Sequence, residues 1–340
     1  MRFHVGLVGG GNITETHARA VQAIPGAEVV AVYGVNSIKV ARIAEQFGGK
    51  AYTDYEAFQA HRPMEMVAIG SPSGLHAQHG IAAARRGIHV LTEKPLEINL
   101  ERADAFITEA ESAGVKLGVM FQDRVKPGIR RLRELIASGA LGKILYADAR
   151  VKWFRPAEYY SGSRWRGTLV LDGGGALINQ AVHTVDLLLW LLGDVNRVQA
   201  RTTTAFHKIE AEDTALAILE FASGALGTLQ ATTAAYPGYP RRVEITGTQG
   251  TVILEHDRIV SADLRNSPAG FDLDCESDRN PSASSATVSD FRGHQALFED
   301  FFNAMNSGGE PVCNGREGRR SVALVDAIYR AAKSKTSIQI

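Results

Sequence analysis

The chain opens with an apolar run, Phe3 to Val8, followed at once by Gly9-Gly10-Gly11 and then by a helical stretch from Thr14 to Ala23. A strand, a glycine turn and a helix in this order let the backbone approach a pyrophosphate held at the helix N-terminus. Thr14 stands where the usual pattern has its third glycine. The fingerprint is therefore imperfect, and a simple strand-to-helix turn is the alternative interpretation.

Short apolar runs and helical stretches alternate through the first half of the chain. Strands are expected at residues 3–8, 29–33, 66–70, 89–92 and 115–120, and helices at 14–23, 40–47, 76–86 and 100–113. Continuously apolar strands with helices between them indicate a parallel sheet covered on both faces. Right-handed crossovers then give a doubly wound sheet.

The pattern changes after about residue 122. Helices are expected at 127–138, 181–192, 294–306 and 318–333, and strands at 144–153, 195–204, 214–221, 225–233, 243–246 and 251–255. Turn sequences at 222–224 and 247–250 join neighbouring strands into antiparallel hairpins. We expect an α/β protein with a Rossmann domain at 1–122 and a second α/β domain at 123–340, which carries a large, open, mainly antiparallel sheet, binds substrate and forms the oligomer.

Composition excludes several functions. Lys plus Arg and Asp plus Glu both number 37 among 340 residues, so no net field favours nucleic acid or an anionic membrane. The chain shows neither a signal peptide nor a run long enough to span a bilayer. Cys275 and Cys313 form no metal or redox spacing, so no metal site and a cytoplasmic location are expected. Residues 263–290 are rich in Ser, Asp, Asn and Pro, which predicts an exposed loop.

A dinucleotide fold predicts an acidic residue about 20 positions after the glycine turn, where it holds the ribose hydroxyls. Gly34 occupies that position. Asn36, Ser37 and Lys39 follow it and leave room and positive charge for a 2′-phosphate. NADP is therefore slightly favoured over NAD, although Asn36 is also compatible with an unphosphorylated ribose.

Two further turns follow strands at the edge where open parallel sheets bind ligands. After the strand at 66–70, Ser71 and Ser73 are placed to meet cofactor phosphates or ribose; a helix cap at Ser73 is the equal alternative. After the strand at 89–92 comes Glu93-Lys94-Pro95. A lysine there can hydrogen-bond the reacting oxygen and stabilise an alkoxide, whereas such a turn taken alone is usually a solvated loop.

These residues resemble a known family. Gly9 to Ile13 with His17, the turn from Ser71 to His76, Glu93-Lys94-Pro95 and the stretch from Gly173 to Asp186 are similar to the glucose–fructose oxidoreductase / inositol dehydrogenase / MocA family, along essentially the whole chain. The resemblance implies a Rossmann domain joined to an α/β domain with an open sheet. It also implies a tightly held NAD or NADP and oxidation or reduction of a sugar, cyclitol or related hydroxyl compound.

The resemblance also assigns roles. Lys94 falls on the family's catalytic lysine and His183 on its general acid/base, while Asn179 stands where many members have an aspartate. Residues four apart share one face of a helix, so Asn179 and His183 can point at one substrate. An imidazole can accept a hydroxyl proton near neutral pH. Asparagine cannot, so Asn179 is expected to orient the substrate.

Other positions complete the expected site. Trp165 and Arg166 lie near nicotinamide and substrate in related proteins; Arg166 and Arg124 can bind an anionic group, and Tyr236 can stack on a sugar ring or belong to a surface turn. Asp186 is expected to orient the helix or a neighbouring backbone. The expected cofactor residues are Gly9, Gly11, Asn12, Ile13, Asn36, Ser37, Lys39, Ser71, Pro72, His76, Glu93, Lys94 and Gln122.

The predicted function is hydride transfer between nicotinamide C4 and a secondary alcohol or ketone of a sugar or sugar derivative. Asn179-Gln180 with Trp165-Arg166 resembles members that oxidise the 3-hydroxyl of nucleotide-linked N-acetylglucosaminuronate. An NAD-retaining glycosidase and a dinucleotide-sensing regulator are the alternatives, and Lys94 with His183 argues against the regulator. A sheet face without helical cover predicts a homodimer or homotetramer.

Overall fold

The computed structural model describes residues 2–266 and 290–340, which divide into two compact units. The first comprises residues 2–122 and 290–322, and the second residues 123–266 and 323–340. Residues 290–322, expected in the second domain, belong to the first unit because helix α9 (Arg292–Ser307) packs on helix α1 (Asn12–Gln22). Phe302 of α9 also stacks on Phe3 at a ring-centroid distance of 4.0 Å.

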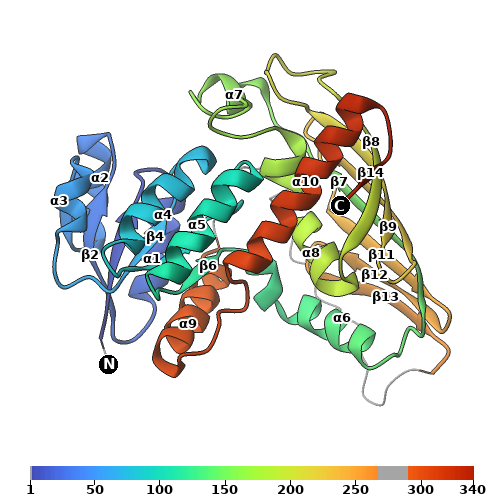
Figure 1. Ribbon diagram of the computed structural model, residues 1–340, viewed down its shortest axis with the longest axis horizontal. Coiled ribbons are helices and arrows are strands. Elements are labelled where there is room, and N and C mark those ends of the chain that lie inside the picture. Colours follow the sequence, from blue (N-terminus) through green and yellow to red (C-terminus); the bar gives the residue numbers. More distant parts are fainter. Residues whose placement is uncertain (1, 267–289) are drawn as a thin grey trace. The chain divides into compact units, whose positions relative to one another are not determined.

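The first unit is a doubly wound parallel sheet, as the alternating pattern predicts. The six strands run in the order β3-β2-β1-β4-β5-β6, and each neighbouring pair is parallel. Their bounds are β1 Phe3–Val8, β2 Ala27–Tyr33, β3 Lys50–Tyr52, β4 Met66–Ile69, β5 His89–Thr92 and β6 Leu117–Val119. The flanking helices in Figure 1 are α1, α2 Ser37–Phe47, α3 Tyr55–Gln59, α4 His76–Ala84, α5 Leu100–Ser112 and α9.

Backbone pairing continues one residue beyond four of these strands. Gly9 N donates to Tyr33 O at 2.7 Å, and Gly70 N donates to Val8 O at 2.7 Å. Further along the sheet, Glu93 N donates to Ile69 O and Met120 N to Thr92 O, both at 2.8 Å. The turns after β1, β4, β5 and β6 therefore share the carboxyl edge of the sheet, where parallel α/β folds bind ligands.

The second unit is built on an eight-stranded sheet in the order β13-β12-β11-β7-β10-β9-β8-β14. The strands are β7 Ile144–Lys152, β8 Val195–Thr203, β9 Thr214–Phe221, β10 Leu226–Thr232, β11 Arg242–Gly247, β12 Gly250–Glu255, β13 Arg258–Leu264 and β14 Ile338–Gln339. The hairpins β9–β10 and β11–β12 are antiparallel as expected, whereas β7 and β10 pair in parallel. The sheet is thus mainly, not wholly, antiparallel.

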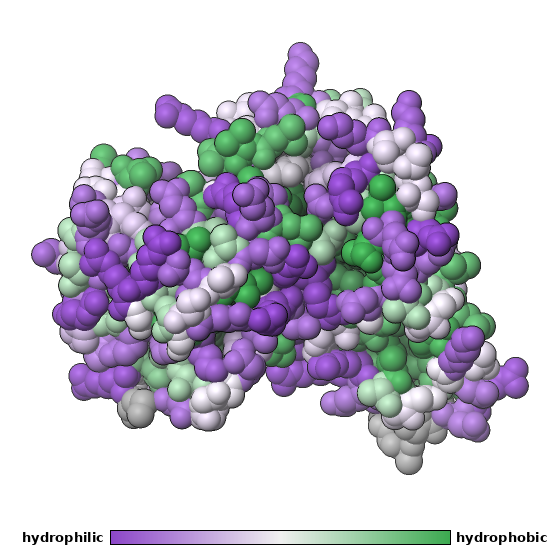
Figure 2. Space-filling view, in the orientation of Figure 1, coloured by the Kyte–Doolittle hydropathy of each residue, from purple (hydrophilic) through white to green (hydrophobic). Residues whose placement is uncertain are grey.

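Helices cover one face of this sheet. The apolar residues of α6 (Pro127–Ala137), of α8 (Val182–Leu192) and of the later turns of α10 (Gly315–Ser334) form one core with the inward residues of the strands (Figure 1). On the other face, Leu216 and Ile218 of β9 are 49% and 51% exposed. In Figure 2, hydrophobic surface is visible on the side of this sheet among hydrophilic residues.

Some expectations differ from the structure in detail. A π-helix (Ala176–Ala181) precedes α8, so the helical segment begins five residues earlier than expected. The loop expected at 263–290 starts later, since β13 runs to Leu264; residues 267–289, with Cys275, lie outside the described part of the chain. Cys313 is buried and forms no disulfide within the described residues. None of the described helices is long and apolar enough to cross a membrane.

Candidate active site

The glycine turn after β1 is fixed by packing at Gly9. This residue has φ +132°, and a Cβ on it would lie 2.6 Å from Thr14 Oγ1 and 2.8 Å from Gly70 O. Thr14 is completely buried, with its side chain against the turn. The threonine that made the fingerprint imperfect therefore fills space at the helix–turn contact, where the third glycine usually permits close packing.

The start of α1 has room for a ligand. A Cβ on Gly11 would meet no atom within 4 Å, so the protein's own packing does not require glycine there. Gly11 is the N-cap of α1, and no side chain caps the helix. An open, uncapped helix N-terminus after a glycine turn fits a bound phosphate group, because its N–H groups and dipole favour negative charge. Asn12 and Ile13, both expected to meet the cofactor, form the first turn of this helix.

The segment after β2 explains the missing acid. A Cβ on Gly34 would lie 2.8 Å from Val40 Cγ1 and 3.3 Å from the Gly9 backbone, so a larger residue does not fit. Asn36 caps α2 by accepting a hydrogen bond from Lys39 N at 3.0 Å. Lys39 is exposed, and its Cβ is 3.5 Å from the position of a Cβ on Gly10. Lys39 therefore lies beside the glycine turn with an exposed side chain, and Ser37 is exposed as well.

The turns after β4 and β5 are braced by histidines. His76 Nε2 lies 3.0 Å from Ser71 O, and His76 Nδ1 lies 2.8 Å from Pro95 O. His76 is 1% exposed, so it joins the two turns instead of facing a cofactor. His79 Nδ1 lies 3.0 Å from Ser71 Oγ, and burial lowers the pKa of His79 to about 4, which keeps this imidazole neutral. Ser73 begins a short 3-10 helix and caps nothing.

Lys94 stands out in its turn because it is partly exposed. Within residues 90–97 every other residue is buried. Glu93, expected to bind the cofactor, is instead 7% exposed, and its carboxylate lies between His17 and His294. Pro72 remains partly exposed beside Ser71, and Gln122 is partly exposed after β6. The first unit thus presents Lys94, Ser71, Pro72 and Gln122 on turns at one edge of the sheet.

Burial also distinguishes two residues in the second unit. From 176 to 186, Asn179 and His183 are the only residues that are not buried. They come from different helix types, since Asn179 lies in the π-helix and His183 in the first turn of α8. Asn179 Nδ2 donates to Asp172 Oδ1 at 2.5 Å, and Gln180 Nε2 donates to Asn179 Oδ1 at 2.9 Å. These bonds fix the amide, in keeping with an orienting role.

The glycines before this segment are required by packing. A Cβ on Gly174 would lie 2.1 Å from Tyr329 Oη, and one on Gly175 would lie 1.8 Å from Glu212 O. The Glu212 carboxylate accepts hydrogen bonds from Gly175 N at 3.1 Å, Leu177 N at 2.8 Å and Tyr329 Oη at 3.1 Å. Burial raises the pKa of Glu212. This acid, which the sequence analysis missed, fixes the beginning of the segment that carries Asn179 and His183.

Arg124 is placed differently from the expectation. It is 1% exposed and donates from Nε and Nη2 to the two carboxylate oxygens of Asp186, at 2.8 and 2.6 Å. A bidentate buried pair holds α8 and occupies the guanidinium that was expected to meet substrate. Asp123 was not expected in the site. Burial alone would raise its pKa, but Arg241, Lys126 and His183 outweigh burial and hold the pKa of Asp123 well below its usual range.

Two of the remaining expected residues, Trp165 and Arg166, form an aromatic and cationic group with Tyr159 in the second unit. The Arg166 guanidinium lies over the Tyr159 ring at 4.3 Å and near the Trp165 ring at 5.6 Å. Tyr159 Oη accepts a hydrogen bond from Gln180 at 2.9 Å, which links this group to Asn179. Tyr236 is 77% exposed and contacts only Phe154 edge-on among described rings.

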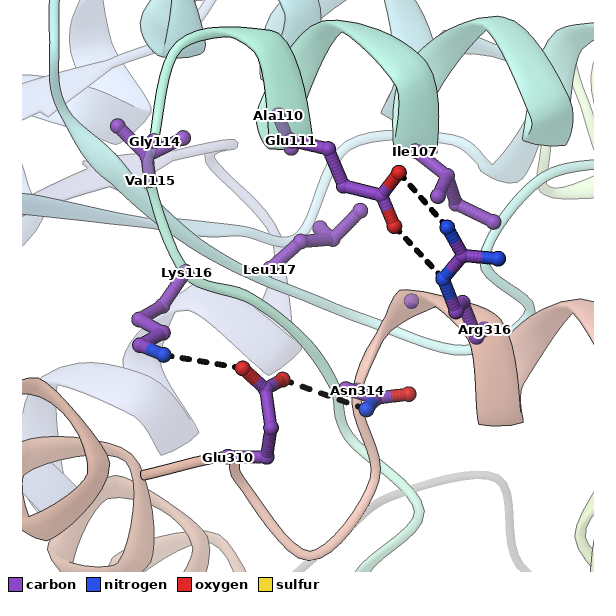
Figure 3. Close-up of a pocket in the computed structure, with 11 residues that line it drawn as sticks. Ile107, Ala110, Glu111, Gly114, Val115, Lys116, Leu117, Glu310, Asn314 and Arg316 are labelled. Carbon is purple, nitrogen blue, oxygen red and sulfur yellow. Dashed lines mark hydrogen bonds and ion pairs between the residues drawn. The ribbon is translucent and has the colours of Figure 1, made fainter. Parts of the chain in front are cut away.

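A separate hollow of about 470 Å³ in the first unit contains none of the expected site residues. It lies between the end of α5, strand β6 and residues 310–316 (Figure 3). Its charged groups are already paired: Lys116 with Glu310 at 2.9 Å and Arg316 with Glu111 at 2.7 Å. The hollow therefore offers no unpaired charge to a ligand.

The parallel sheet, the glycine turn and the open N-terminus of α1 define a Rossmann dinucleotide-binding protein. Residues 3–121 match the model of the oxidoreductase family with NAD-binding Rossmann fold, and residues 129–253 match the GFO/IDH/MocA C-terminal domain. The chain belongs to this family of NAD-dependent sugar oxidoreductases, as its motifs indicate.

Individual relatives span the whole chain. The WlbA dehydrogenase from Bordetella pertussis, solved in complex with NADH and UDP-GlcNAcA, is 33% identical, with a TM-score of 0.91 and coverage of 100% of this chain and 98% of that one. The myo-inositol 2-dehydrogenase of Thermotoga maritima is 26% identical over 99% of this chain and 98% of its own. The inositol 2-dehydrogenase of Rhizobium meliloti is 27% identical over 100% of both.

The contact at Gly175 predicts a stability effect. In Gly175→Ala the new methyl group would lie 1.8 Å from a backbone oxygen that no side-chain rotation can move. We expect the free energy of unfolding in urea to fall by at least about 1–3 kcal/mol, the usual cost of overpacking. Gly309→Ala is the control, because its Cβ would meet only the flexible Ser307 hydroxyl at 3.1 Å. Equal stability of the two variants would contradict this account of the glycine run.

Proposed function

We propose that this oxidoreductase acts on a secondary hydroxyl of a nucleotide-linked sugar acid of the UDP-N-acetylglucosaminuronate type, with Lys94 and His183 as its catalytic residues. The observation that carries the proposal is the burial pattern. Within residues 90–97 and 176–186, only Lys94, Asn179 and His183 are partly exposed, and every other residue is buried. Polar side chains left open in such surroundings are favoured candidates for contact with a ligand.

The chemistry follows from the residue types. When bound at the turn after β1, the nicotinamide dinucleotide supplies the hydride acceptor or donor at C4. In the oxidation direction His183 accepts the hydroxyl proton, and its imidazolium is stabilised by the nearby Asp123 carboxylate. The Lys94 ammonium donates a hydrogen bond to the same oxygen and stabilises its developing negative charge. Asn179, fixed by Asp172 and Gln180, orients the sugar.

The substrate class is supported by the group around Arg166. A half-buried guanidinium between Tyr159 and Trp165 offers a cation for a carboxylate or diphosphate, with aromatic faces for a sugar ring. The exposed rings of Tyr236 and Phe206 add stacking surface for a planar group. The Bordetella pertussis relative holds UDP-GlcNAcA.

The activity test follows nicotinamide absorbance with UDP-N-acetylglucosaminuronate and with myo-inositol. We expect turnover of the nucleotide sugar, and a fall in kcat of about 10²–10⁴-fold in Lys94→Ala and in His183→Ala, since each removes a group that acts in the transition state. Lys143→Ala and His61→Ala are the matched controls. Turnover of myo-inositol alone would overturn the substrate class. Release of free sugar from an aryl glycoside without net cofactor turnover would show that the enzyme is a glycosidase that retains its cofactor, and would overturn the proposed dehydrogenase reaction.

We also propose that NADP binds at least as well as NAD, with Lys39 as the determinant. Gly34 leaves no acid to repel a 2′-phosphate, and exposed Lys39 lies beside Gly10. In Lys39→Ala we expect the Kd for NADPH, measured by fluorescence, to rise about tenfold, or ~1.4 kcal/mol, with little change for NADH. Lys50→Ala is the control. A wild-type preference for NAD above about tenfold would overturn the proposal.

The uncovered face of the eight-stranded sheet is proposed to bind a second copy of the chain, giving a dimer or tetramer. Leu216, Ile218 and Leu226 are each about half exposed on this face or at its strand ends. In Ile218→Glu we expect a lower mass by sedimentation, because a buried carboxylate opposes association. Ile38→Glu, on exposed α2, is the control. A wild-type monomer would refute this assembly.

A further inference from the structure

A buried carboxylate in the first unit lies between two histidines. Glu93 Oε1 is 3.0 Å from His17 Nε2, on α1, and 3.2 Å from His294 Nε2, on α9. The side chains of the two histidines are 0% and 2% exposed, and that of Glu93 is 10% exposed. The second oxygen, Glu93 Oε2, accepts a hydrogen bond from the backbone N–H of Lys94 at 3.2 Å. The four residues thus form one connected group, here called the Glu93 clamp.

The ionisation of Glu93 and of His17 follows from their contacts and burial. Burial alone would raise the pKa of Glu93, but hydrogen bonds from His17 and His294 outweigh burial and hold that pKa well below its usual range. Burial lowers the pKa of His17, so this imidazole stays neutral. An ionised carboxylate oxygen can accept two hydrogen bonds. The geometry therefore fits two rings that each donate Nε2–H to Oε1.

A metal ion is the competing explanation, since His17, Glu93 and His294 place ligand atoms within 4.8 Å of one another. Metal-bound histidines almost always donate their other ring N–H to a partner. Here both Nδ1 atoms are buried without a hydrogen-bond partner among the described residues. When Nε2 carries the proton, Nδ1 has only a lone pair, and leaving a lone pair without a partner costs less than burying an N–H group without one. The hydrogen-bonded arrangement is favoured.

We propose that His17 and His294 are positioning residues that act through Glu93 on the backbone of Lys94. The proposal rests on the proposed catalytic role of Lys94. The turn is held on both sides of that residue, because Glu93 Oε2 holds the Lys94 N–H and His76 Nδ1 lies 2.8 Å from Pro95 O. With its backbone fixed, only the lysine side chain moves, which lowers the cost of aligning the ammonium with the reacting oxygen.

The first test measures the backbone directly, without substrate. In His294→Leu, which removes one donor from Glu93, we expect hydrogen exchange at the Lys94 amide, followed by mass spectrometry, to accelerate at least about tenfold. His294→Gln, whose amide can still donate to Oε1, should restore most of the protection. Phe298→Leu is the packing control, because this buried residue of α9 contacts His17 but is not hydrogen-bonded to Glu93. Unchanged exchange at Lys94 in His294→Leu would overturn the proposal.

The second test is kinetic and uses UDP-N-acetylglucosaminuronate with NAD. His294→Leu should lower kcat about tenfold or more, with little change in KM for NAD. In a Lys94→Ala background the same substitution should have no further effect on kcat, since both changes act on one group. Additive effects would show that His294 acts elsewhere and would overturn the proposal. An unchanged kcat in Lys94→Ala alone would instead refute the proposed function, while the exchange test still decides on the clamp.

The zinc content of the protein distinguishes a hydrogen-bonded Glu93 clamp from a metal site. The purified protein is expected to contain no stoichiometric zinc by plasma mass spectrometry. If the wild-type protein contains one equivalent of zinc and His17→Leu contains none, the three residues form a metal site and the proposed positioning role is overturned.

Discussion

Three backbone segments meet at Gly9, and the rest of the first unit depends on that contact. A Cβ on this residue would collide with Gly70 O and Thr14 Oγ1, and a Cβ on Gly34 would press on the Gly9 backbone. The turns after β1, β2 and β4 can converge only because these positions lack side chains. Because these turns converge, the open N-terminus of α1 lies beside the other turns at the carboxyl edge of the parallel sheet. The shape of the proposed dinucleotide site therefore depends on the missing side chains of Gly9 and Gly34 as well as on the side chains around it.

In the second unit, too, a glycine-rich segment is held by close packing, here by two side chains. Glu212 and Tyr329 come from distant parts of the chain and converge on the glycine run at 173–175. Their hydrogen bonds hold the beginning of a π-helix, a conformation that is rare and is frequent at functional sites. In both units, therefore, a buried acid fixes a backbone segment: Glu93 beside Lys94, and Glu212 before Asn179 and His183. The residues proposed to react are the ones left partly open.

The sequence was a good guide wherever the determinant was local. Strand and helix periodicity predicted the parallel sheet, the hairpins and most element positions, and the motifs predicted the family. Prediction from the sequence failed where contacts between distant parts of the chain determine whether a side chain is exposed. Arg124 looked like a free cation on a loop, but Asp186, far along the chain, buries it. His76 and Glu93 looked open to a ligand, yet their partners lie in other turns and helices. The π-helix and the short strand β3 carry no distinct periodic signal.

The return of the chain to the first unit has a consequence for the order of events during synthesis. Helix α9 packs on α1, and Asn314 forms an antiparallel β-bridge with Gly118 of the edge strand β6, yet both come late in the sequence. A ribosome that has produced the complete parallel sheet has still not produced α9 or the segment that pairs with β6. Domains ordinarily fold as they emerge, N-terminal first. Here the first unit is finished only once residue 322 is available, so the two units must mature together.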